Sequence, residues 1–139
     1  MKIVFGTIAL FLAATSSALA MDASELATFA SRYRSSSNAP VVFQRYDAGC
    51  RANIPVALVQ TRNLGNGRVA GITSEYACWG ATFTYFEMTR GNLNSIRAFA
   101  AVNAGRSTGY SNWGPANPME RMSASEMQAI AEAINATGY

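Results

Sequence analysis

The sequence predicts an α+β fold, with a small antiparallel sheet of about four strands and three helices in the order α-β-β-β-β-α-α. Three observations lead to this prediction. Apolar residues recur at helical spacing near both ends of the chain, and short runs of β-branched and aromatic residues lie between them. The two cysteines of the 139-residue chain are also placed so that one disulfide could hold the sheet together.

The first 20 residues have the pattern of a secretory signal peptide. Lys2 precedes an apolar run over residues 3–14, and small residues follow up to Ala20. The run is about 12 residues long, short of the roughly 20 that a membrane-spanning helix needs. We therefore expect cleavage after Ala20, no membrane span in the mature chain, and a single α+β domain over residues 21–139 in the periplasm or outside the cell.

The mature chain is expected to begin with a helix. In "MDASELATFASRYR", Asp22 is suited to cap the helix, and Glu25 stands three residues later, as in a capping box. An apolar face follows at helical spacing, formed by Leu26, Phe29, Ala30 and Tyr33.

Four strands are predicted in the next part of the chain. They are expected over Val41–Tyr46, Ile54–Arg62, Arg68–Ala77 and Ala81–Met88, because these segments are rich in β-branched and aromatic residues. Asn66-Gly67 between the second and third strands is typical of a two-residue type I′ hairpin. Such a turn makes the numbers of facing residues sum to 133, which would place Cys78 opposite Pro55 at the open end of the hairpin.

Cys50 and Cys78 are predicted to form a structural disulfide. Exported proteins fold in oxidising compartments, where a pair of cysteines is usually bonded. The chain contains no histidine, so the usual base for a cysteine nucleophile and a common ligand for a metal site are both missing. The bond would close a loop of about 29 residues and, on the chain-entropy model, stabilise the fold by about 3–4 kcal/mol.

Two further helices are predicted towards the end of the chain. The segment "NLNSIRAFAAVNAG", Asn92–Gly105, has Leu93, Ile96, Phe99 and Ala100 on one helical face. Ser123 and Glu126 repeat the capping box before the last helix, whose apolar face is formed by Met127, Ile130, Ala131 and Ile134.

A segment of 18 residues without clear periodicity, Gly105–Met122, separates these two helices. Long irregular loops within compact domains are uncommon and often functional. This one contains Arg106, Tyr110, Trp113 and Arg121, and these residue types are enriched at the energetic centres of interfaces. We therefore expect a partner-binding surface here, with the alternative that Trp113 folds back to fill the core.

Composition argues against several classes of function. Net charge is +3 with Lys2 and +2 without it, too weak to indicate nucleic-acid binding. The sequence has no phosphate-binding glycine loop, zinc signature or serine-nucleophile motif, so no catalytic residue, cofactor or metal site is predicted.

The pattern that remains favours a small exported domain that binds another protein, of the inhibitor, immunity or effector kind. One alternative is a carboxylate-based hydrolase of envelope or cell-wall glycans, since Glu75 and Glu87 flank an aromatic run and could share a cleft. Another is an accessory subunit of an envelope assembly. The sequence leaves open the partner or substrate and the oligomeric state.

Overall fold

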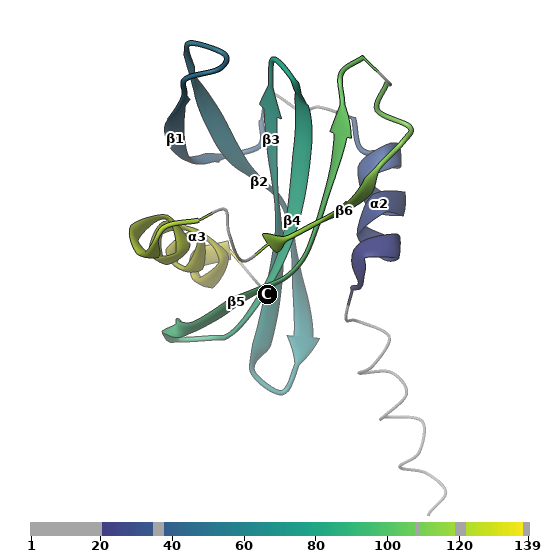
Figure 1. Ribbon diagram of the computed structural model, residues 1–139. Helices are drawn as coiled ribbons and strands as arrows, with labels where there is room; N and C mark the ends of the chain where they lie inside the picture. The colour runs from purple at the N-terminus through teal and green to yellow at the C-terminus, as the bar shows by residue number, and fades with distance from the viewer. Residues whose placement is uncertain (1–20, 35–37, 108, 119–121, 138–139) are drawn as a thin grey trace, which may run out of the picture.

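A computed structural model describes residues 21–34, 38–107, 109–118 and 122–137 of the chain (Figure 1). In this part, a six-stranded antiparallel meander, in which every strand pairs with its neighbours in sequence, is combined with two helices. The predicted signal peptide, residues 1–20, lies outside the described residues. The elements in chain order are α2 (Ala23–Arg32), β1 (Val41–Asp47), β2 (Ala52–Gly65), β3 (Arg68–Ala77), β4 (Gly80–Thr89), β5 (Asn92–Gly105), β6 (Gly114–Ala116) and α3 (Ala124–Thr137).

The two helices pack on opposite faces of the sheet, α2 on the right and α3 on the left in Figure 1. Successive side chains of a strand point to opposite faces, and β4 shows this directly. Phe83 and Tyr85 belong to the hydrophobic cluster that contains residues of α2, whereas Phe86 and Met88 belong to the cluster that contains residues of α3. The sheet is therefore the middle of three layers and carries a hydrophobic core on each side.

Both predicted capping boxes are confirmed. Asp22 Oδ1 accepts a hydrogen bond from the Glu25 N–H at 2.9 Å, and Glu25 Oε1 accepts one from the Asp22 N–H at 3.0 Å. At α3, Ser123 Oγ accepts from the Glu126 N–H at 3.2 Å, and Glu126 Oε1 accepts from the Ser123 N–H at 3.0 Å. Each helix therefore begins where its local sequence indicates.

The four predicted strands correspond to β1, β2, β3 and β4, and the hairpin between β2 and β3 turns at Asn66-Gly67. Both turn residues have positive φ, 56° and 77°, as a type I′ turn requires. Gly65 pairs with Arg68, in the register expected from the turn. Two irregularities in β2 then shift the register, so that Val56 pairs with Glu75. The expected placement of Cys78 opposite Pro55 is therefore wrong by two positions.

The helix predicted over Asn92–Gly105 is wrong, because this segment is the strand β5. Its Leu93, Ile96 and Ala100 are three and four residues apart, which suggested a helix. In the sheet the same segment alternates, with Ile96 and Ala98 buried and Arg97 and Phe99 exposed. Pairing with β4 along the strand decides the outcome, since tertiary contacts override a weak local helix preference.

The segment predicted as an irregular loop contains the short strand β6, whose residues pair with Ala101–Asn103 of β5. The described residues thus form six strands and two helices, where about four strands and three helices were predicted. No helix in these residues is long and apolar enough to cross a membrane.

Gly71 in β3 allows α3 to lie close to the sheet. A Cβ atom at this position would come within 2.6 Å of the Cγ1 and Cδ1 atoms of Ile134 in α3. Ile134 is fully buried, so it could not give way without disturbing the core. The position of α3 relative to β3 therefore depends on glycine at residue 71.

Candidate functional site

Three connections of the meander lie at the same end of the sheet, the upper end in Figure 1. They are the β1–β2 turn, the β3–β4 turn and the segment between β5 and β6. Adjacent antiparallel strands run in opposite directions, so every second connection falls at the same end. We call this surface the loop end and define it as residues 46–51, 78–79, 106–107 and 109–113.

A disulfide and several hydrogen bonds hold the loop end together. The predicted bond between Cys50 and Cys78 is confirmed, with a Cα–Cα distance of 5.6 Å. Asp47 accepts hydrogen bonds from the Cys50 N–H at 3.0 Å and from Trp79 Nε1–H at 3.2 Å. The Trp79 carbonyl in turn accepts from the Arg106 N–H at 2.8 Å. The three connections are thus linked to one another as well as to their strands.

Trp113 joins the loop end to the core on the α2 side. Its ring is half-buried and meets the buried ring of Phe83 edge to face, with centroids 5.2 Å apart. The ring of Tyr110 stacks on Trp113 at 6.0 Å and meets Tyr76 edge to face at 5.7 Å. Trp113 Nε1–H also donates to the Tyr110 carbonyl. Trp113 therefore lies between the buried Phe83 and Tyr110 and holds Tyr110 in place.

Exposed aromatic side chains are concentrated at the loop end. Five large hydrophobic side chains are exposed among the described residues, and three of them lie here: Tyr46 at 65%, Trp79 at 41% and Tyr110 at 39%. Arg51 and Arg106, both exposed, add two positive charges. Aromatic and arginine side chains in one place make a surface typical of protein–protein contacts.

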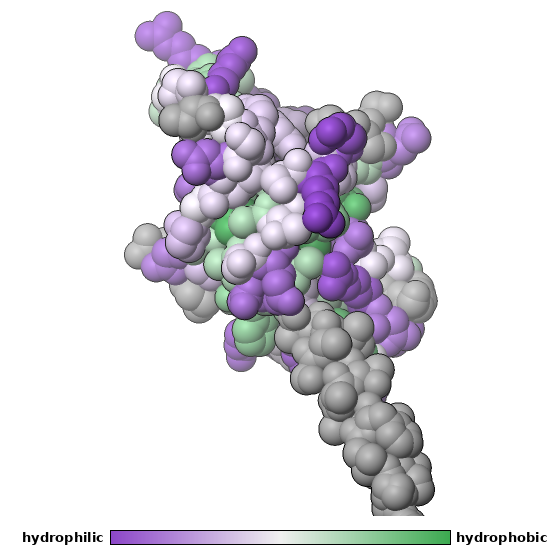
Figure 2. Space-filling view, turned by 90° about the vertical axis from the view of Figure 1, so that its right-hand side faces the viewer, coloured by the Kyte–Doolittle hydropathy of each residue, from purple (hydrophilic) through white to green (hydrophobic). Residues whose placement is uncertain are grey.

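Figure 2 shows the molecule from the side of α2. Hydrophobic residues appear as a limited area at mid-height, and hydrophilic and pale residues of intermediate hydropathy surround it. On this side the exposed surface thus offers polar and amphipathic groups more than a broad aliphatic patch.

Of the predicted binding residues, Arg106, Tyr110 and Trp113 come together at the loop end, and Arg121 lies outside the described residues. Sequence reasoning missed Tyr46 and Trp79, which lie on other segments of the chain. The cysteines were the signal that could have found them. Trp79 follows Cys78 directly, and Tyr46 stands four residues before Cys50, so the predicted disulfide already brings both near one place.

The two glutamates proposed as a possible catalytic pair are both held by arginines. Glu75, only 7% exposed, accepts a hydrogen bond from Arg45 at 2.8 Å, and the same guanidinium reaches Glu126 of α3 at 3.5 Å. Burial lowers the pKa of Arg45, but the hydrogen bond and charge of Glu75, with the charges of Glu126 and Asp47, raise it further than burial lowers it. The guanidinium of Arg45 thus connects β1 with β3 and α3.

Glu87 takes part in a separate cluster. It accepts a hydrogen bond from the Tyr85 hydroxyl at 2.8 Å and an ion-paired one from Arg68 at 3.0 Å. Burial of the phenol raises the pKa of Tyr85, and its hydrogen bond to Glu87 raises the pKa further. Tyr85 therefore stays protonated at neutral pH and donates a hydrogen bond to Glu87.

The two carboxylates do not share a cleft, because they lie on opposite faces of the sheet. Glu75 pairs with Thr82 of β4, so both point to the same face. Glu87 is five residues beyond Thr82 on the same strand and therefore points to the other face. In the described part of the chain, no group of three or more histidine, cysteine, aspartate or glutamate residues could hold a metal ion.

Comparisons of the chain with protein-family models, with curated proteins and with solved structures found no match.

Proposed function

We propose that this chain is a small exported domain, periplasmic or secreted, that binds another protein through the loop end. Its action would be of the inhibitor, immunity or effector kind. The observation that carries the proposal is the concentration of exposed Tyr46, Trp79 and Tyr110 on one disulfide-linked surface. Aromatic side chains bury a large area and lose little rotamer freedom, so they are efficient anchors.

The rigidity of the surface supports a binding role. Trp79 and Tyr110 are each held by neighbours, Trp79 by Asp47 and Tyr110 by the rings of Trp113 and Tyr76. A side chain that is already fixed in place pays less entropy when it binds, so preorganisation adds to affinity. The pair of exposed arginines would favour a partner with acidic groups around an apolar centre.

The alternatives have less support. A two-carboxylate hydrolase needs both carboxylates in one cleft, where they flank the scissile bond, whereas Glu75 and Glu87 face opposite sides of the sheet and each is ion-paired. An accessory role in an envelope assembly would use the same kind of surface as an inhibitor. The identity of the partner would distinguish these two roles.

The test is to use the mature chain as bait in culture fluid and envelope extract, identify the retained protein, and measure its affinity for variants. Replacing Trp79 and Tyr110 together with alanine should weaken binding by at least about 2 kcal/mol, or roughly thirty-fold. Val41→Ala is the matched control, since Val41 is 54% exposed but lies outside the loop end. Equal losses in the double variant and the control would contradict the proposal.

A further inference from the structure

The first part of β5 is an open edge of the sheet. β5 pairs with β4 on one side, but on the other side β6 pairs only with Ala101–Asn103. If this register continued, Pro118 would come opposite Phe99, and proline has no N–H to donate to a ladder. Among the described residues, no strand therefore pairs with the outer side of β5 over residues 92–100.

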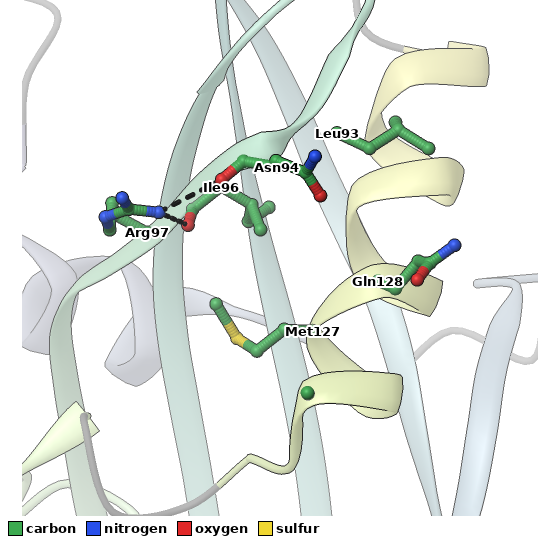
Figure 3. Close-up of a pocket in the computed structure, with 7 residues that line it drawn as sticks. Leu93, Asn94, Ile96, Arg97, Met127 and Gln128 are labelled. Carbon is green, nitrogen blue, oxygen red and sulfur yellow. Dashed lines mark hydrogen bonds between the residues drawn. The ribbon is translucent and has the colours of Figure 1, made fainter.

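The outward direction of the main chain is visible at two residues of this edge. One nitrogen of Arg97, Nη1, donates hydrogen bonds to the carbonyls of Asn94 at 3.2 Å and Ile96 at 2.7 Å (Figure 3). In an antiparallel strand the N–H and C=O of one residue point the same way. The main-chain N–H and C=O groups of Asn94 and Ile96 thus point away from β4. The Arg97 side chain covers these two carbonyls on the outer side of the strand. A charged side chain on the edge is a common way to prevent unwanted strand pairing.

An open hollow of about 430 Å³ lies between this edge and α3. Leu93 and Ile96 of β5 and Met127 of α3 provide its apolar side chains, and Asn94 and Gln128 contribute amides (Figure 3). Arg97 is the charged residue among those that line it, although its side chain turns away from Met127 (Figure 3), and the lining includes no acidic residue. Phe99, 54% exposed, stands at the irregularity in β5 just beyond the hollow.

The positive charge of Arg97 at this edge is exposed and can be reached by a partner. In the register of β4 and β5, Glu87 stands opposite Arg97. Glu87 is already engaged by Tyr85 and Arg68, and Arg97 instead turns to the carbonyls of its own strand. An incoming carboxylate could bind the exposed guanidinium and draw it away from those carbonyls, which would then be free to accept hydrogen bonds from a new strand.

We propose that the β5 edge, residues 92–99, binds an extended acidic peptide segment of a partner protein, which adds to the sheet as an antiparallel or parallel strand. The open main-chain groups select an extended peptide. The hollow accepts one apolar side chain, and Arg97 selects a carboxylate next to it. This surface lies at the opposite end of β5 from the loop end, so its binding is independent of the function proposed above.

The probe is a display library of random octapeptides, selected on the purified mature chain with its disulfide formed. We expect enrichment of peptides that carry aspartate or glutamate beside a large apolar residue. The best peptide is labelled with fluorescein and its affinity is measured by fluorescence polarisation. It should bind Arg97→Glu about ten-fold or more weakly than it binds the unchanged chain, and the loss for Arg97→Gln should be smaller. Exchanging its acid for lysine should restore part of the binding to Arg97→Glu.

Two controls make the result specific. Arg106→Glu reverses an exposed charge at the loop end and should leave the affinity of the peptide unchanged. Hydrogen exchange should show the bound peptide protecting amides within residues 93–97. The proposal is overturned if no acidic peptide is enriched, if circular dichroism shows both Arg97 variants folded and their affinities unchanged, or if protection falls elsewhere.

Discussion

Replacing Trp113 with alanine should destabilise the fold, because this partly buried side chain packs against the core on the α2 side. The change removes the edge-to-face contact with Phe83 and the stacking on Tyr110, and each aromatic pair contributes about 0.5–1.5 kcal/mol. It also removes the hydrogen bond from Nε1–H to the Tyr110 carbonyl, worth about 0.5–1.5 kcal/mol. Full burial of tryptophan would set an upper range of about 3–5 kcal/mol. For a half-buried ring we expect a loss of about 2–4 kcal/mol.

Urea unfolding followed by circular dichroism measures this loss. The midpoint should fall in Trp113→Ala while the slope stays the same, as expected when stability changes and the unfolded state does not. Tyr110→Ala is the matched comparison, because it removes the stacked ring but keeps the contact between Trp113 and Phe83. It also removes the contact with Tyr76, and at about 0.5–1.5 kcal/mol for each of the two aromatic pairs it should cost about 1–3 kcal/mol. A loss below about 1 kcal/mol in Trp113→Ala would show that the ring is not packed on the core.

Three further predictions concern stability. Replacing both Cys50 and Cys78 with serine should lower the free energy of unfolding by about 2–4 kcal/mol, and a variant that melts at the same temperature as the oxidised wild type would contradict this contribution of the bond. Ser123→Ala should cost about 1 kcal/mol through loss of the cap of α3, and an unchanged urea midpoint would rule this out. Because the folded pKa of Tyr85 is raised above its unfolded value, its contribution is complete at neutral pH and is lost as pH rises above about 10. The stability advantage of the wild type over Tyr85→Phe should therefore shrink in alkaline solution, and an advantage independent of pH would refute the assignment.

Much of the fold could be predicted because its signals are local. Capping boxes at Asp22 and Ser123 depend on side chains three residues apart, and the turn at Asn66-Gly67 depends on two residues that accept positive φ. The segment of β5 carried no such signal. Its alanines suit a helix, and their burial arises from pairing with β4 and from packing beneath both helices, which are long-range contacts.

The candidate site could be predicted only in part, because only some of its residues carry a local signal. Tyr110 and Trp113 stood out because they occupy one irregular segment. Tyr46 and Trp79 belong to other segments, and their place at the loop end follows from the order of the meander and from the disulfide. With β5 expected to be a helix, the connection after it could not be placed beside the turns at Cys50 and Cys78.

Site-specific photo-crosslinking tests the role of the loop end most directly. A photoreactive phenylalanine analogue is placed at Tyr46, Trp79 or Tyr110, and at the exposed control positions Val41 and Thr28, in the chain expressed by its native host. Binding through the loop end predicts that the three loop-end positions form an adduct with the same protein and that the controls do not. Adducts of equal yield from all five positions, or from the controls alone, would contradict it.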